Sequence, residues 1–449
     1  MNADHELLRA TLQRFAADRL RPEFLRWRTE PYPRERILEM GELGLLGLRV
    51  PVEHGGGDGS FVELGIVNEE LGRGDVSVAY FPQLAAISAE LLKRADVGLQ
   101  QRWLPPLATG EAVIAYGLTE PSTGSDAAAI KLQMRRDGSD WVLNGEKASI
   151  TFAGLAEAAI IFARSGGEGA RGVSGVLVPL DAPGITRGVY PSSSTPLTQR
   201  GSLHFNNVRV PADHQIGVEG AGFVSAMQAL DFNRALIGLA VMGAGFQSLD
   251  ETMEYTKART TFGQPLAKRE AVAFSIAEHL ASLRAARALA YEALAMADAG
   301  VPYVAEGAMV KWLGPKLAAE AIHRCILLHG WMGFSTELPF EARLHDVMSL
   351  EVGDGTAEIM KGIIAREAMG REYVAYRYQP ADKSPLSERT DGEGVRSPGE
   401  DRGAGPTSSR VGGVARAAPD SWSRPVRRDV GGRSAHGTPA PCYPWHRGR

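Results

Sequence analysis

The 449-residue chain is long enough for several domains, and its 44% hydrophobic and 23% charged residues are ordinary for a globular protein. Its net charge of −4 gives no global attraction to nucleic acid or to an anionic membrane, and two cysteines exclude a disulfide framework or a multi-cysteine metal site. The sequence starts with acids where a signal peptide carries cations, and no apolar run approaches the ~20 residues of a membrane span. We therefore expect a cytoplasmic protein with no metal and no nucleic-acid or membrane partner.

Residues 1–111 are predicted to form an N-terminal helical domain. Apolar residues recur at helical spacing in 7–15 and again in 64–71. A glycine-rich loop at 51–57 separates the two helical stretches.

Residues 112–215 change character and predict a middle antiparallel β domain. Short apolar runs at 160–162, 176–178 and 203–205 are broken by glycine and proline, which is typical of strands. The pair Asn144–Gly145 follows an apolar run and indicates a hairpin turn, after which a second strand would return.

Residues 216–379 return to helical spacing and predict a C-terminal four-helix bundle. Apolar side chains recur at three- and four-residue intervals in 227–241, a break follows at 260–265, and further helices are expected at about 303–328 and 356–374. The expected fold class is a multidomain α+β protein with helical, β and helical parts in that order.

The remaining residues, 380–449, have a different composition. They hold 11 glycines and 9 prolines, but only six residues of the types Leu, Ile, Val and Phe. Because so little apolar surface cannot offset the entropy of ordering, this Gly/Pro/Arg-rich tail is predicted to be disordered. A solvated extension is the interpretation that the composition favours, and an arginine-bearing arm for nucleic acid stays open beside it.

A loop of small polar residues in the β domain is the most informative local feature. The run Leu118–Asp126 reads LTEPSTGSD, so hydroxyl groups and a glycine stand close together beside a proline. Such a loop can bring backbone N–H groups and hydroxyls up to an anionic or heteroaromatic ligand. An ordinary turn between a strand and a helix would have a similar composition.

Four further motifs accompany this loop in a fixed order. They are NGEK with IT at 144–151, FNNVRVP at 205–211, RTTFGQP at 259–265, and GTAEI with AR at 355–366. With the loop at 118–126, they resemble the acyl-CoA dehydrogenase family of flavoproteins, and the resemblance covers nearly all of residues 1–379.

The resemblance implies that the chain binds FAD and forms a homo-oligomer, commonly a tetramer. The implied cofactor-binding residues come from the β domain, from a neighbouring subunit, and from the helix over the adenosine diphosphate part: Tyr116, Leu118, Thr119, Gly124, Ser125 and Thr151; Arg259 and Phe262; Thr356 and Glu358. Thr151 would approach the flavin atom that accepts hydride. By itself, Arg259 would more simply be a solvated cation at a helix end.

The implied reaction is α,β-dehydrogenation of an acyl-CoA or carrier-protein-bound acyl thioester, with an electron-transfer flavoprotein as the expected oxidant of the flavin. The chemistry needs a carboxylate that removes the α-proton, and the family places a glutamate directly before Gly-Thr. Here that position holds Asp354, which is one methylene shorter. The alternative base position of the family corresponds to Asn233, which cannot act as a base. An Asx-type helix cap is the other interpretation of Asp354.

The substrate site is expected to include Ser125, Asp231, Arg234 and Gly355. Asp231 and Arg234 match a motif of relatives that handle CoA, although a surface ion pair would have the same spacing. Small residues stand at 149 and 353, where relatives often have aromatic ones, so a bulky, branched or cyclic acyl group would fit. Relatives with an aspartate base that act on alicyclic thioesters, of the cyclohexanecarboxyl-CoA dehydrogenase type, point the same way.

Two other functions stay open at this stage. A flavin oxidase of the same superfamily, of the nitroalkane oxidase type, also uses an aspartate to deprotonate carbon. A DNA-associating flavoprotein of this fold would need a basic C-terminal domain, for which residues 380–449 offer only a weakly positive segment.

Overall fold

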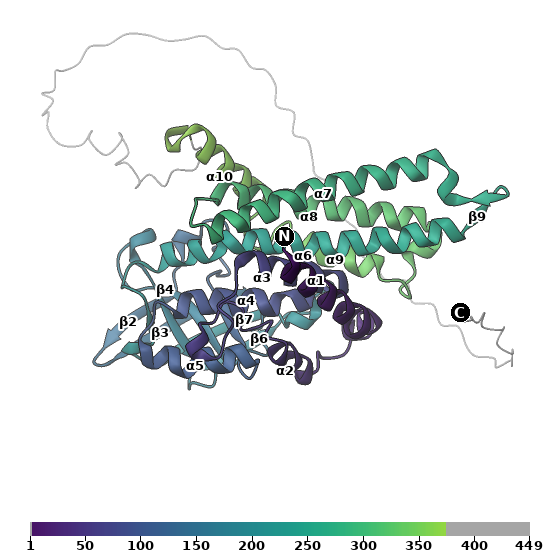
Figure 1. Cartoon of the computed structure of the whole chain (residues 1–449). Coiled ribbons are helices and arrows are strands. Elements are labelled where there is room, and N and C mark those ends of the chain that lie inside the picture. The colour runs from purple at the N-terminus through teal and green to yellow at the C-terminus, as the bar shows by residue number, and fades with distance from the viewer. Residues whose placement is uncertain (1, 374–449) are drawn as a thin grey trace, which may run out of the picture. The chain divides into compact units, whose positions relative to one another are not determined.

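A computed structural model describes residues 2–373 and gives the predicted order of a helical part, a β part and a second helical part (Figure 1). The tail predicted to be disordered, 380–449, lies outside the described residues. The N-terminal helices are α1 (Ala3–Phe15), α2 (Arg34–Glu42), α3 (Phe61–Gly74), α4 (Val76–Leu92) and α5 (Val97–Thr109).

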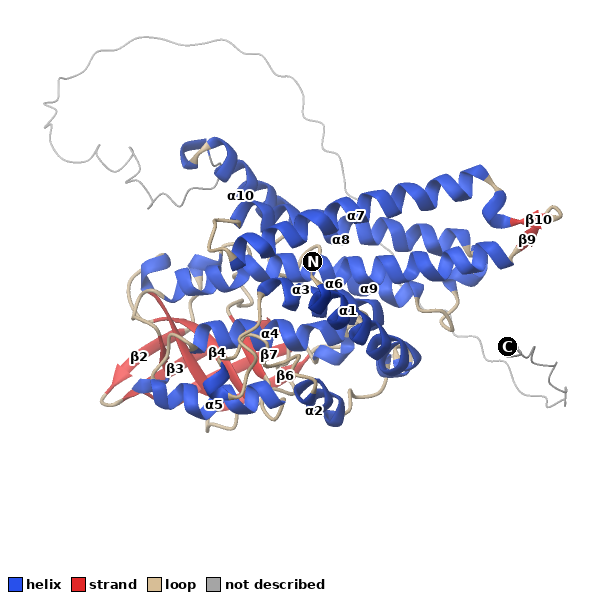
Figure 2. Cartoon of the chain, in the orientation of Figure 1, coloured by secondary structure: helices blue, strands red, loops and turns tan. Residues whose placement is uncertain are grey.

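Helix α4 is the element that joins the N-terminal helices to the rest of the molecule. All but one of its residues are buried, because the helix is apolar on every face and packs against both strand β1 and helix α6. Asp75 caps its first turn by accepting a hydrogen bond from the backbone N–H of Ser77 at 2.7 Å. Figure 2 shows α4 between the sheet and the long helices.

The β domain is one eight-stranded sheet in the order β6-β7-β3-β2-β4-β5-β8, with β1 beside β4. Its pairs are antiparallel except where β4 meets β1 and β2, which run parallel to it. The bounds are β1 (Ile114–Gly117), β2 (Gln133–Asp137), β3 (Asp140–Ile150), β4 (Ala158–Arg164), β5 (Val173–Pro179), β6 (Ile185–Val189), β7 (Gly201–Pro211) and β8 (Gln215–Ile216).

The predicted hairpin turn at Asn144–Gly145 is wrong. Strand β3 runs straight through both residues, and the turn lies earlier, at Gly138–Ser139 between β2 and β3. Asn144 is held by the neighbouring strand instead, since its side chain accepts a hydrogen bond from the backbone N–H of Asn207 at 2.8 Å. Gly145, with φ +135°, takes up a register shift against β7. Long-range pairing thus overrides a local turn signal.

The C-terminal part is a bundle of long helices that stands beside the sheet (Figures 1 and 2). Its helices are α6 (Gly222–Ala258), α7 (Glu270–Asp298), α8 (Val304–Leu328), α9 (Phe340–Ser349) and α10 (Ala357–Met369). Helices α6, α7 and α10 all pack against α8. The predicted break at 260–265 is a small antiparallel hairpin of β9 (Thr260–Thr261) and β10 (Gln264–Pro265).

By length and composition alone, helix α6 is long and apolar enough to cross a membrane. However, 94% of its apolar stretch is buried inside the protein, which is what a central core helix shows. Neighbouring helices and the sheet cover it, so its hydropathy follows from its place in the bundle.

Candidate active site

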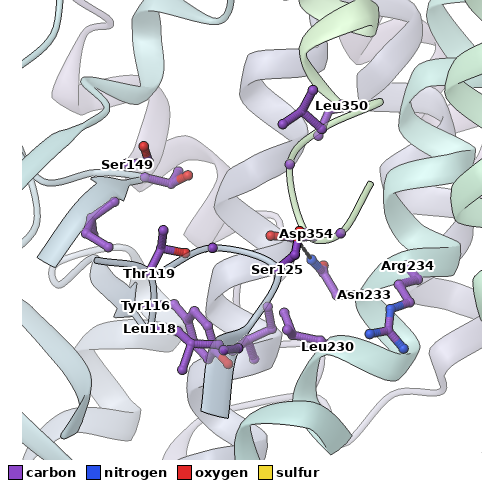
Figure 3. Close-up of a pocket in the computed structure, with 18 of the residues that line it drawn as sticks. Tyr116, Leu118, Thr119, Ser125, Ser149, Leu230, Asn233, Arg234, Leu350 and Asp354 are labelled. Carbon is purple, nitrogen blue, oxygen red and sulfur yellow. Dashed lines mark hydrogen bonds between the residues drawn. The ribbon is translucent and has the colours of Figure 1, made fainter. Parts of the chain in front are cut away.

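A cavity of about 310 Å³ lies where the β domain meets α4, α6 and the loop between α9 and α10. Figure 3 shows polar residues of the β domain along one side and Asp354, Asn233 and Arg234 on the other. The cavity contains ten of the residues that the sequence singled out: Tyr116, Leu118, Thr119, Gly124, Ser125, Thr151, Arg234, Asp354, Gly355 and Thr356.

The β side of the cavity is formed by the loop that follows β1 and by the end of β3. A buried ion pair fixes this loop, since the Lys147 ammonium donates to a carboxylate oxygen of Glu120 at 2.8 Å and to the carbonyl of Leu118 at 2.9 Å. Burial lowers the pKa of Lys147 to about 8, against the opposing effect of Glu120. The lysine of the NGEK motif therefore holds the hydroxyl-bearing loop in place.

Tyr116 forms part of the cavity wall beneath that loop. Its hydroxyl donates to the carbonyl of Ala226 at 3.3 Å, and burial, with a smaller contribution from the charge of Asp354, raises the pKa of Tyr116 well above its usual value. The phenol therefore stays neutral and acts as a wall and hydrogen-bond donor rather than as an acid or base.

Asp354 lies in the loop that connects α9 to α10, on the helical side of the cavity. Its backbone has φ +58°, and Gly355 follows with φ +111°. The carboxylate is exposed and lines the cavity, and Asn233 of α6 donates to its Oδ2 at 2.8 Å. Among the described residues, no side chain donates a hydrogen bond to the other carboxylate oxygen of Asp354. That oxygen is therefore open toward the cavity.

The helix cap belongs to another residue. Thr356 is the N-cap of α10, since its hydroxyl accepts from the backbone N–H of Ile359 at 3.4 Å. The alternative interpretation of Asp354 as a cap is therefore wrong, because the neighbouring threonine does this instead.

Asp231 and Arg234 form an ion pair on α6, and Arg234 is buried at the edge of the cavity. The interpretation as a solvated surface pair is therefore wrong. Burial lowers the pKa of Arg234 and raises that of Asp231, while each charge acts against the shift of the other. The Nε of Arg234 has no hydrogen-bond partner among the described residues, so this buried guanidinium still has a free donor.

Three of the predicted cofactor-binding residues do not line the cavity. Arg259 and Phe262 are exposed at the hairpin of β9, which Figure 1 shows at the far end of the long helices. Glu358 is exposed in the first turn of α10. Their roles stay predictions.

Sequence reasoning missed one wall of the cavity and one cation. The wall consists of Tyr80, Leu84 and Ile87 on α4. Their spacing of four and three residues was a readable signal of one helix face, but nothing local indicated that this face borders a cavity. The cation is Arg200, which donates to the carbonyl of Ser149 at 3.1 Å and to the Tyr80 hydroxyl at 3.4 Å.

The chemistry of the donors fits a flat heteroaromatic cofactor. No hydrogen bond within the described chain engages the hydroxyls of Thr119, Ser125 or Thr151, so these groups can serve a bound molecule. A Cβ added at Gly124 would meet nothing within 4 Å, so the backbone there is open to close approach. Apolar side chains of Leu118 and Ile150 line the same cavity.

Three family models match the chain almost end to end over its described part. They are the N-terminal, middle and C-terminal domains of acyl-CoA dehydrogenase, at residues 2–111, 115–208 and 220–369. The human mitochondrial short-chain specific acyl-CoA dehydrogenase is 34% identical over 369 residues, which cover 80% of this chain and 89% of the relative.

Solved structures give the same result for the fold. Butyryl-CoA dehydrogenase from Megasphaera elsdenii has a TM-score of 0.79 at 27% identity, with 82% of this chain and 98% of that chain covered. A glutaryl-CoA dehydrogenase from Mycobacterium smegmatis in complex with FADH2 has a TM-score of 0.79 at 28% identity, with 84% and 97% covered.

Proposed function

Since this chain belongs to the acyl-CoA dehydrogenase family and catalyses FAD-dependent dehydrogenation of an acyl-CoA thioester, we propose that Asp354 is the base that removes the α-proton. The observation that supports this role is the carboxylate at the cavity, with one oxygen held by Asn233 and the other oxygen open. The second position that the family uses for a base holds this same Asn233, so both positions converge on one point of the cavity.

The reaction breaks two C–H bonds of the acyl group and forms a C=C bond. Asp354 receives the α-proton on its open oxygen, and the electron pair of that bond becomes the new π bond. FAD, when bound, supplies the acceptor for the hydride that leaves the β-carbon. Asn233 keeps the carboxylate in one orientation by its hydrogen bond at 2.8 Å, and a substrate that fills the cavity excludes water from the carboxylate.

The other polar residues of the cavity bind rather than react. The free hydroxyls of Thr119 and Thr151 are placed to donate to the cofactor from the β side. The buried Arg234, with its unused Nε donor, is suited to the CoA part of the substrate, and Asp231 balances its charge.

The acyl group is proposed to be branched or cyclic. An aspartate base reaches less far than a glutamate, so the α-carbon must come closer to the loop. Gly353 leaves space for this, since a Cβ there would have only ordinary contacts, at 3.6 Å from Leu350. The exposed Ser149 leaves further room where a larger side chain would stand.

The surroundings of the enzyme are also proposals. An electron-transfer flavoprotein is the expected oxidant, and one similar structure comes from work on such a protein of Acidaminococcus fermentans. A homotetramer would give Arg259 and Phe262 a neighbouring subunit to serve, because both are exposed and do not line the cavity of their own chain. The cytoplasm remains the proposed location.

Anaerobic mixing with a panel of straight, branched and cyclic acyl-CoAs tests this function. The purified protein should be yellow and should lose its flavin absorbance fastest with the branched or cyclic members. Asp354→Asn should stay yellow but bleach at least ~100-fold more slowly, by the usual contribution of a general base. Bleaching of this variant at the native rate would remove Asp354 from the mechanism, and bleaching by a nitroalkane alone would indicate an oxidase.

A further inference from the structure

A lysine of helix α8 is buried behind the Asp354 loop. Lys311 is 1% exposed, and its ammonium donates to the carbonyl of Leu350 at 2.6 Å and to the carbonyl of Gly355 at 3.0 Å. Among the residues that the structure describes, both of its hydrogen-bond acceptors are backbone carbonyls, and no carboxylate pairs with it. Fully buried lysines are rare unless they are paired, so this one needs a reason.

The two carbonyls bracket the loop that carries Asp354. Leu350 directly follows the last residue of α9, and Gly355 directly follows Asp354. Between them the chain enters the left-handed region, with φ +58° at Asp354 and +111° at Gly355. A non-glycine residue at positive φ is held there by its surroundings, and Lys311 contacts both ends of the segment.

Burial of this amine is costly for the protein. It lowers the pKa of Lys311 to about 8, and the nearby charge of Asp354 opposes that shift. An apolar side chain of similar length would fill the same space without that cost, but it could not donate to the two carbonyls. Lys311 therefore supplies hydrogen-bond donors to the loop that carries Asp354, and the protein buries a charged group to do so.

The same arrangement occurs on the other side of the cavity. Lys147 donates to the carbonyl of Leu118 and so fixes the β-side loop, as Lys311 fixes the helical-side loop. Lys147 also has the carboxylate of Glu120 as a partner, whereas the acceptors of Lys311 are backbone carbonyls alone. The contacts of Lys311 are thus directed entirely at the loop.

We propose that Lys311 is a positioning residue for Asp354: its two hydrogen bonds fix the loop so that the carboxylate meets the α-carbon. This inference rests on the proposed role of Asp354 as the base. A misplacement of about 1 Å costs ~10²-fold in rate, so loosening the loop should reduce the rate of proton removal much more than substrate binding.

The test compares Lys311→Met and Lys311→Gln with the matched control Lys316→Met. Lys316 lies on the same helix and is exposed, with Glu320 as its partner, so its removal leaves the loop untouched. The glutamine can still reach one carbonyl with its amide and keeps the test valid if the methionine variant does not fold. Each FAD-loaded enzyme is mixed anaerobically with the best acyl-CoA of the panel. The limiting rate of flavin reduction and the half-saturating concentration are then measured.

For Lys311→Met we expect a limiting rate about 10- to 100-fold lower, with half-saturation within about 3-fold of native and full FAD content. Lys311→Gln should lie between this variant and the native enzyme, and Lys316→Met should match the native enzyme. Hydrogen exchange of the amides in 350–356 is followed by mass spectrometry. It should become at least about 10-fold faster in Lys311→Met and stay at the native rate in Lys316→Met.

A native limiting rate in Lys311→Met would overturn the inference, as would a joint loss of FAD, substrate binding and rate, which indicates a general structural role. The Asp354→Asn variant separates this failure from failure of the proposed function. If that variant is slow while Lys311→Met is fast, only the role of Lys311 fails. If Asp354→Asn is itself fast, the proposed base fails, and Lys311 has no base to position.

Discussion

Asp346 and Asp354 lie close together in the sequence, the first within α9 and the second in the loop after it, and the protein treats their carboxylates in opposite ways. Asp346 is fully buried and accepts from the guanidinium of Arg28 at 2.8 and 2.7 Å and from the backbone N–H of Thr195 at 2.6 Å. Asp354 is exposed at the cavity and is held by Asn233. A carboxylate that stabilises the fold is saturated with donors, whereas one that is to receive a proton keeps an oxygen open.

A second acid belongs to the buried region. Burial raises the pKa of Asp75 to about 7, and the charge of Asp346 adds to this shift. Asp346 also has a raised pKa, because burial outweighs the effect of Arg28. The stability of the buried region therefore depends on how its charges are balanced, and substitutions there should alter the free energy of unfolding. Substitutions at the cavity should alter the reaction.

The largest effect on stability is expected for Asp346→Ala. The change leaves Arg28 without its buried partner, and such losses cost about 3–5 kcal/mol, which lowers the melting temperature by several degrees. Thermal unfolding measures it. Asp137→Ala, which breaks an exposed pair with Arg209, is the control and should leave the melting temperature nearly unchanged. Equal melting curves for the two variants would show that the buried Asp346 stabilises the fold no more than an exposed carboxylate does.

Asn233→Asp should change the pH dependence of the reaction. It places a second carboxylate at the 2.8 Å contact with Asp354, and two like charges this close cannot easily be ionised together, so loss of the second proton from the pair moves to higher pH. The acidic limb of kcat/KM should therefore move to higher pH. Asn233→Leu removes the hydrogen bond without adding a charge. The acidic limb of its kcat/KM profile should therefore not move to higher pH. An unmoved limb in Asn233→Asp would place residue 354 outside the reaction.

An effect that depends on pH is expected for Asp75→Asn. Because the folded pKa lies near 7 and the ordinary value is 3.8, folded Asp75 binds more protons than the unfolded chain between these two values. The free energy of unfolding therefore falls as the pH rises through that window. Asparagine can still cap α4 but does not titrate.

The variant should consequently be more stable than the native protein at pH 8, with the difference shrinking toward pH 4. Thermal unfolding at both pH values measures this. Asp96→Asn changes an exposed cap of α5 and is the matched control. A gain that is the same at both pH values would show that Asp75 does not titrate as described.

The sequence was sufficient for the order of helical and β parts, because hydrophobic periodicity is a local property. It was misleading at Asn144–Gly145, where pairing of β3 with β7 decides the structure. For the site, the motifs pointed to the hydroxyls of the β side and to Asp354. The contact between Asn233 and Asp354 joins residues that are 121 positions apart, and the contact between Lys311 and Gly355 joins residues 44 apart. No local pattern contains such pairs, so the supports of the base could be found only in the fold.

Deuterium uptake at the α-carbon tests the central claim most directly. An acyl-CoA with sulfur in place of its β-carbon has no hydride to give, so in D2O the FAD-loaded enzyme can only remove and return the α-proton. Native protein should exchange this position readily, and Asp354→Asn should do so at least ~100-fold more slowly while binding the analogue equally well. Exchange at the native rate in Asp354→Asn would contradict the account, because another group would then be taking the proton.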